Sequence, residues 1–225
     1  MSKPVLVFAE QSDNKLAEVS LELVSKGREL ADRLGAPLGA LLCGHRVDGL
    51  AAELFAYGCD DVYIADHPEL ALYRTLPYSK VVGGALRKLE PRIVLYGATH
   101  VGRDLAPRIA SELKAGLTAD CTDLQIGDHK DSTGEYKDLL LQIRPAFGGN
   151  IIATIICPNT LPQMATVREG VMRMKRLEKP KAGRIHKLAT PVEGADLVVQ
   201  VLQRETRQRK VNLKGANIVV SGGAG

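Results

Sequence analysis

The sequence predicts an α/β fold: a doubly wound, mainly parallel sheet with helices on both faces and added hairpin strands. Short apolar runs alternate with amphipathic stretches through the first 117 residues, which is typical of strand–helix crossovers in a parallel sheet. The run at 4–9 (PVLVFA) is apolar throughout, as in a strand covered on both faces. After Gly116 the helical stretches stop, and short loops join the remaining apolar runs, which indicates hairpins.

The first half alternates strands with helices. Continuous apolar runs predict strands at 4–9, 38–43, 62–65 and 93–96. A first helix is expected to begin with Ser12 or Asp13 as its cap and to end at Gly35 and Pro37. Helical spacing of apolar residues predicts further helices at 50–57, 78–89 and 104–113.

The second half predicts strands at 118–126, 138–144, 151–157 and 163–168, with polar turns at 127–134 and 148–150. Residues 178–196 contain two prolines and two glycines and have the composition of a linker. We therefore expect an N-terminal α/β domain over 1–195 and a linker with connecting strands over 196–216. The apolar residues that lead into the glycines at 217–225 predict the first strand and turn of a second domain, and the sequence ends there.

Composition is typical of a globular protein, with 45% hydrophobic and 25% charged residues and a mean hydropathy of -0.05. No apolar run approaches the ~20 residues of a membrane span, and no signal peptide precedes the first strand. The four cysteines lack metal-binding spacing, so we expect reduced thiols in a cytoplasmic protein without membrane insertion. No histidine pair or nucleophile motif predicts a metal or a covalent catalyst.

The charge is uneven along the chain. Residues 173–214 hold 12 of the 30 basic and 4 of the 26 acidic residues, a net +8 that leaves the remainder at −4. A basic segment is one signature of nucleic-acid binding, but this one contains no aromatic residue for base stacking. A solvated linker or a surface for an acidic partner is the favoured interpretation, and no nucleic-acid partner is expected.

The loop at 97–104 (GATHVGRD) follows a predicted strand and opens a helix, where open α/β sheets bind ligands. Its spacing imitates a phosphate-binding loop, but Arg103 and Asp104 stand where lysine and a hydroxyl residue are needed. A tight turn with Asp104 near the positive end of the helix is the better interpretation. The alternative is a stand-alone adenine-nucleotide-binding module that uses this loop.

The segment at 144–150 (RPAFGGN) is the most informative candidate site. Pro145 favours an extended Arg144, and the two glycines permit close approach by another group. A permanently charged arginine suits a ligand that becomes anionic during a reaction, such as the ring of a flavin on reduction. The alternative, an arginine at a strand end before an ordinary turn, is favoured when these residues are considered by themselves.

Six segments together resemble the α subunit of electron-transfer flavoproteins, in that family's order: VLVFAEQ, GATHVGRDLAPRIA, GLTADCT, RPAFGGNIIATI, PQMATVREGVM and IVVSGG. The resemblance covers essentially the whole chain. It implies an N-terminal α/β domain of the adenine-nucleotide-hydrolase-like type, a following FAD-binding domain, and a heterodimer with a β subunit. It also implies that electrons pass from an acyl-CoA or other flavin dehydrogenase to a redox acceptor. The protein would then be an electron carrier or a subunit of an oxidoreductase.

The form RPAFGGN is similar to the electron-bifurcating branch of that family. The resemblance implies NADH as electron donor and a second FAD in the β subunit, approached by an arginine of the α subunit. Arg144 is the matching position and takes the role of tuning that flavin, with Phe147 and Asn150 as neighbours.

The closing segment contains the other cofactor-binding residues that the resemblance implies, Ser221, Gly222 and Gly223. Ala224 stands where the family places an arginine on the FAD of the α subunit. Because the FAD domain would follow the last residue, we expect this chain not to hold that FAD by itself, and to reach the FAD of the β subunit through Arg144.

Overall fold

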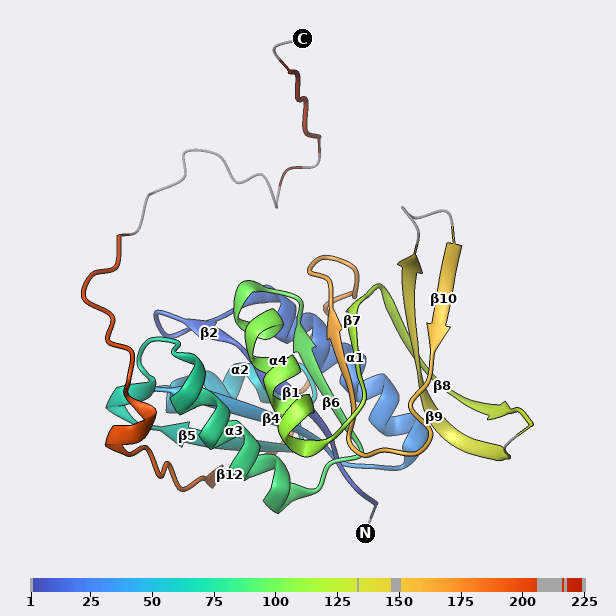
Figure 1. Ribbon diagram of the computed structural model, residues 1–225, viewed down its shortest axis with the longest axis horizontal. Coiled ribbons are helices and arrows are strands. Elements are labelled where there is room, and N and C mark those ends of the chain that lie inside the picture. Colours follow the sequence, from blue (N-terminus) through green and yellow to red (C-terminus); the bar gives the residue numbers. More distant parts are fainter. Residues whose placement is uncertain (1, 133, 147–150, 206–215, 217, 224–225) are drawn as a thin grey trace.

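The structure, a computed structural model, describes residues 2–132, 134–146, 151–205, 216 and 218–223 (Figure 1). Within these residues seven strands form one sheet in the order β12-β5-β4-β1-β6-β11-β7, and every neighbouring pair is parallel. The strands are β1 (Val5–Ala9), β4 (Leu38–Gly44), β5 (Asp61–Asp66), β6 (Ile93–Gly97), β7 (Leu117–Cys121), β11 (Gln163–Val167) and β12 (Arg184–Lys187). We call this sheet and its helices the body.

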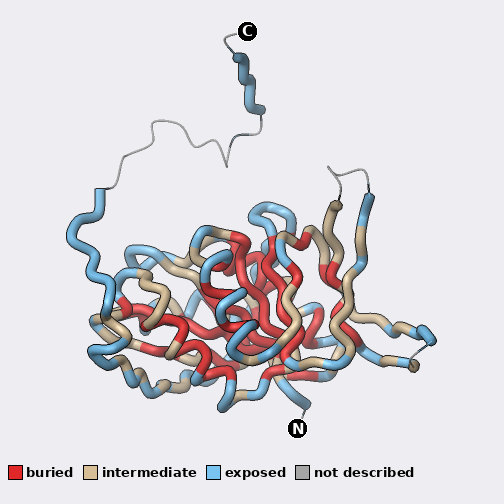
Figure 2. The backbone as a smooth tube through the Cα atoms, in the orientation of Figure 1, coloured by how far each residue is buried: buried red, intermediate tan, exposed pale blue. Residues whose placement is uncertain are grey.

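Helices cover both faces of the body, as the sequence predicts. One core layer packs helices α1 and α2 against the sheet, and the second packs α3 and α4 against the other face. The helices are α1 (Glu18–Leu34), α2 (Ala51–Ala56), α3 (Thr75–Leu89) and α4 (His100–Leu113), with short 3₁₀ turns at η1 (Asp48–Leu50), η2 (Pro68–Leu70) and η4 (Gly194–Asp196). Every residue of β1 is buried, because this strand lies near the middle of the sheet and is covered on both faces (Figure 2).

The entry into α1 differs from the prediction. Residues 11–16 form a small hairpin of β2 (Gln11–Ser12) and β3 (Lys15–Leu16). Its turn is made by Asp13 and Asn14, with φ of 53° and 56°, a conformation that these two residue types adopt more readily than most. Helix α1 begins only at Glu18 with no side-chain cap, so the prediction that Ser12 or Asp13 caps it is wrong.

Two other helices begin earlier than predicted. Helix α3 starts at Thr75 rather than at residue 78, and α4 starts at His100 rather than at residue 104. The first turn of α3 contains Pro77 and that of α4 contains Gly102, and both residue types weaken the local signal for a helix although the first turn tolerates them. No helix in the described part of the chain is long and apolar enough to cross a membrane.

The added hairpin strands are confirmed, but they form a sheet of their own. Strands β8 (Asp123–Lys130), β9 (Glu135–Ala146) and β10 (Ile151–Ile155) pair antiparallel in the order β10-β9-β8, and we call them the arm. The predicted strand at 118–126 is divided between β7 and β8, with the break at Thr122. Figure 1 shows the arm beside β7, extending away from the body.

The predicted linker at 178–196 contains β12, which extends the sheet beyond β5. Contacts to Asp61 from Arg184 and His186, together with the backbone pairing, hold this edge strand in the absence of a recognisable apolar run. No strand is found in the described residues from 196 onward. Ile218–Val220, predicted as a strand together with Asn217, is exposed and without regular structure, and Asn217 lies outside the described residues.

Candidate functional site

Arg144 lies near the end of strand β9, in the middle strand of the arm. Its partner across the antiparallel pair is Ala153 of β10, and its side chain is half-buried. The guanidinium lies close enough to the thiol of Cys121 to affect it: burial raises the pKa of Cys121 to about 11, and the charge of Arg144 opposes that rise. Arg144 therefore lies where the arm joins the body.

No carboxylate among the described residues forms an ion pair with Arg144. The neighbouring strand β10 exposes apolar side chains, with Ile151 52% and Ile152 74% exposed. Ile151 lies two positions from Ala153 and so shares the face of Arg144, and a half-buried cation beside an exposed isoleucine is typical of a surface that meets a partner. Phe147 and Asn150, expected beside Arg144, lie outside the described residues, as does Ala224.

Ser221, Gly222 and Gly223 are described, exposed and without regular structure. Adding a Cβ at Gly222 would meet nothing within 4 Å in the described chain. No described contact links these three residues to Arg144, so the structure does not bring the two groups of predicted site residues together.

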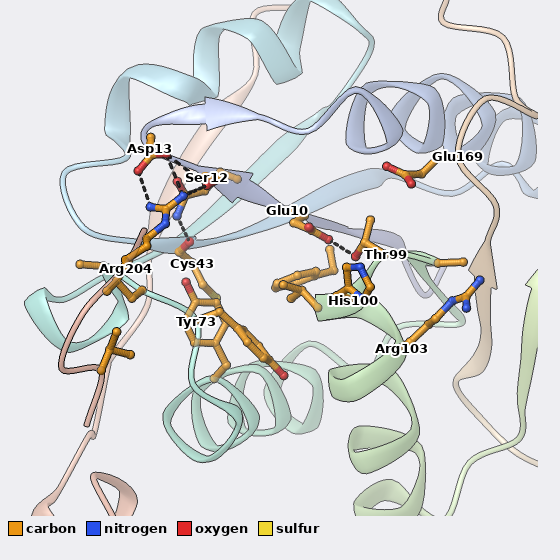
Figure 3. A pocket seen from close by; sticks show the side chains of 18 residues that line it. Glu10, Ser12, Asp13, Cys43, Tyr73, Thr99, His100, Arg103, Glu169 and Arg204 are labelled. Carbon is orange, nitrogen blue, oxygen red and sulfur yellow. Dashed lines mark hydrogen bonds and ion pairs between the residues drawn. The ribbon is translucent and has the colours of Figure 1, made fainter. Parts of the chain in front are cut away.

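A cleft opens where β1 and β6 end, with a volume of about 730 Å³ (Figure 3). This edge is where a doubly wound sheet reverses its strand order, because β4 lies on one side of β1 and β6 lies on the other, and such points bind ligands. Phe8, Cys43 and Tyr78 contribute buried apolar surface to the cleft. Leu72 and Val201 line it from the exposed side.

Thr99 organises the loop that borders the cleft. Its hydroxyl accepts a hydrogen bond from the backbone N–H of Gly102 (3.0 Å), which caps α4, and donates one to Oε2 of Glu10 (2.5 Å). A Cβ on Gly102 would lie 1.8 Å from the carbonyl oxygen of Gly97, so the close approach of loop and helix requires glycine. The carboxylate of Glu10 thus lies at the N-terminus of α4, where a bound phosphate would otherwise be stabilised.

The two residues that depart from a phosphate-binding loop have partners of their own. Asp104 accepts hydrogen bonds from the hydroxyls of Tyr73 and Thr75, both at 2.6 Å, and these bonds hold its pKa below the usual value. Arg103 lies 3.2 Å from Asp120. The loop at 97–104 is therefore a tight turn capped by Thr99, and Asp104 faces α3 instead of an incoming ligand.

The described part of the basic segment binds back onto the body. Arg204 pairs with Asp13 at 2.6 Å on the rim of the cleft. Further along the sheet, Lys181 pairs with Asp60 and Lys187 with Asp48. These pairs neutralise several charges of a segment that the sequence shows as strongly basic, which removes much of the support for a nucleic-acid site.

The cleft brings together residues that the sequence by itself does not single out, above all Glu10 and Leu72, with Thr99 of the loop at 97–104. A signal was present for Glu10 and Thr99: Glu10 directly follows the first apolar strand, and Thr99 precedes Gly102 by the three residues of a capping turn. Among the described residues no group of three or more histidine, cysteine or acidic side chains is placed to hold a metal ion.

The comparisons with known proteins agree on one family. A family described as "Electron transfer flavoprotein domain" matches residues 5–193. The chain is 45% identical over 224 residues to the electron transfer flavoprotein subunit alpha of Thermoanaerobacterium thermosaccharolyticum, with 99% of this chain and 66% of that relative covered.

Two further relatives carry more specific names. One is the acryloyl-CoA reductase electron transfer subunit beta of Anaerotignum propionicum, 41% identical over 241 residues, with 99% of this chain and 66% of the relative covered. The other is the lactate dehydrogenase (NAD(+),ferredoxin) subunit LctC of Acetobacterium woodii, 38% identical, with 98% of this chain and 51% of the relative covered. The chain thus spans just under two thirds of the length of the first of these relatives and about half of the last.

Proposed function

The chain belongs to the electron transfer flavoprotein family, and on that premise we propose that it is the N-terminal part of an α subunit that passes electrons between flavins in a heterodimer. The observation that carries the proposal is Arg144, a half-buried guanidinium on the arm with no carboxylate partner among the described residues. The exposed isoleucines beside it suit a protein partner, which we propose is the β subunit.

We propose that Arg144 approaches an FAD held by the β subunit. The donor set fits that cofactor, because a guanidinium is permanently charged and presents a planar fork of N–H groups to ring oxygens and nitrogens. FAD, when bound, supplies the transfer of one or two electrons. Arg144 supplies positive charge where the ring gains negative charge, and Phe147 and Asn150 are its proposed neighbours.

The other end of the chain has a separate proposed role. We propose that residues 1–195 form the domain, that 196–216 form a linker and that 217–225 begin an FAD-binding domain. We propose that Ser221, Gly222 and Gly223 contact the FAD of the α subunit, since they are exposed and glycine permits close approach to a cofactor.

Relatives suggest which electron transfers are involved. The name of LctC includes NAD(+) and ferredoxin, and that of the Anaerotignum propionicum relative includes acryloyl-CoA reductase. We propose that this chain likewise serves an acyl-CoA or other flavin dehydrogenase, with NADH as electron donor in a bifurcating reaction. All four cysteines are described and free, which supports a reducing compartment such as the cytoplasm.

The test is the reduction potential of the flavin near Arg144 in the complex with the β subunit. Arg144→Ala removes a charged hydrogen bond worth about 1.5–3 kcal/mol, so we expect the two-electron potential to fall by about 30–60 mV. The potential falls because the charge of arginine stabilises the reduced, anionic ring more than the oxidised one.

Lys137→Ala is the matched control, since Lys137 is an exposed cation on the same strand, seven positions from Arg144. Its substitution should leave the potential unchanged. An unchanged potential in Arg144→Ala, or an equal fall in both variants, contradicts the assignment. Arg144→Lys keeps the charge but loses the fork, and an intermediate fall is expected.

A further inference from the structure

We propose that the cleft of the body is a binding site for an uncharged nucleoside, and that Glu10 excludes the phosphorylated forms. The site is independent of the flavin role of Arg144, which lies on the arm. Its position at the carboxyl ends of β1 and β6 and its volume of about 730 Å³ are those of a small-molecule site.

The charges of the cleft disfavour an anionic ligand. Its two arginines already have carboxylate partners, Arg103 with Asp120 and Arg204 with Asp13. No lysine lines the cleft in the described structure. The N-terminus of α4, which would attract a phosphate, instead meets the carboxylate of Glu10 through Thr99.

The chemistry of the walls favours an aromatic ring with hydroxyl groups. Leu72 and Val201 line the cleft from its exposed side, and Phe8 and Tyr78 contribute buried surface within it. Such apolar walls suit an aromatic base. A carboxylate accepts several hydrogen bonds at once, so Glu10 suits the two adjacent hydroxyls of a ribose.

Figure 3 shows the arrangement that makes Glu10 the discriminating group. Glu10 and Thr99 point toward each other beside His100 and are joined by a hydrogen bond. A phosphate at the α4 terminus would therefore meet the negative charge of Glu10, while a neutral sugar would find a hydrogen-bond acceptor there.

Calorimetric titration of the whole chain with adenosine and with AMP tests the proposal. We expect adenosine to bind at least about tenfold more tightly than AMP, the size of one charged hydrogen bond. Glu10→Gln keeps the shape and removes the charge, so it should weaken adenosine and bring AMP to equal or tighter binding. Glu53→Gln, at an exposed carboxylate of α2 that does not line the cleft, should change neither affinity.

Wild-type AMP binding as tight as that of adenosine overturns the proposal, and so does no binding of adenosine at millimolar concentration. If Glu10→Gln fails to fold, amide chemical shifts of the wild-type chain decide the question. Addition of adenosine should shift the amides of residues 71–73 and 98–101, and shifts confined to other regions would contradict the site.

Discussion

Charged side chains around the cleft have partners within the chain, whereas the arginine of the arm has none among the described carboxylates. Around the cleft, Asp13 pairs with Arg204, Arg103 with Asp120, and Glu10 with the hydroxyl of Thr99. On the arm, Arg144 has no carboxylate partner among the described residues, and the strand beside it exposes isoleucines. A surface that satisfies its own charges needs no partner protein, whereas an unpaired cation beside apolar side chains does. The comparison supports the proposal that the partner meets the arm and that the cleft takes a small ligand.

The largest expected effect concerns the glycine that closes the loop of the cleft. A Cβ at position 102 would lie 1.8 Å from the carbonyl oxygen of Gly97, so Gly102→Ala should lower the free energy of unfolding by about 4 kcal/mol. Gly84→Ala is the control, because nothing lies within 4 Å of its added Cβ in helix α3. It should stabilise by about 0.5–1 kcal/mol. Urea denaturation measures both, and similar midpoints for the two variants would show that the loop is not tightly packed.

The next effect compares the interior of the body with the surface of the arm. Leu95 of β6 is fully buried, and Leu95→Ala should cost about 2–5 kcal/mol of stability. Ile152 is 74% exposed, so Ile152→Ala should change the stability of the chain by less than about 0.5 kcal/mol. The same variant should weaken binding of the β subunit. Unchanged binding of the β subunit to Ile152→Ala would remove β10 from the proposed interface.

A smaller effect is expected at the edge strand β12, and it depends on pH. Burial raises the pKa of the Asp61 carboxyl, but hydrogen bonds from Arg184 and His186 outweigh burial and leave the pKa below its usual value. A lowered pKa in the folded state means that this stabilisation is present above the unfolded value of about 3.9 and is lost as pH falls through the folded value.

Acid should therefore release β12 before the body unfolds, and Asp61→Asn should remove the pH dependence of this step. Backbone hydrogen exchange of residues 184–187 at several pH values between neutral and acidic measures it. Equal acid sensitivity in the wild type and in Asp61→Asn would assign the release to other carboxyls. Asp48→Asn, which removes only the exposed pair with Lys187, is the control.

The smallest effect concerns the chain at the rim of the cleft. Arg204 is anchored to Asp13 by an exposed ion pair, and such pairs contribute about 1 kcal/mol or less. Arg204→Ala should leave the unfolding transition unchanged and speed hydrogen exchange only in residues 198–204. A large fall in stability would show that this segment belongs to the core of the body.

The sequence predicts the interior of this molecule better than its edges. Strands β1, β4, β5 and β6 are continuous apolar runs, since both faces of each are covered, and periodicity alone locates them. Strand β12 lies on the sheet edge and is fixed by Arg184 and His186 on Asp61. These contacts join residues about 120 positions apart. The local composition does not contain them, and by itself it predicts a linker.

The candidate sites show the same limit. Arg144 stands out because of the proline and glycines that follow it and because of the resemblance to a family. The cleft cannot be located from the sequence, because Glu10, Leu72 and Thr99 come from three separate loops that only the fold brings together. The sequence predicts a helix cap at Ser12 or Asp13 where the structure has a turn of Asp13 and Asn14, because aspartate and asparagine favour both caps and tight turns.

The central claim, that the arm meets the partner protein and the cleft does not, is tested most directly by hydrogen exchange of the chain alone and in complex with the β subunit. We expect protection of residues 139–146 and 151–155 on the arm, with exchange at 97–104 beside the cleft unchanged. Protection at 97–104 together with unchanged exchange on the arm would contradict the account.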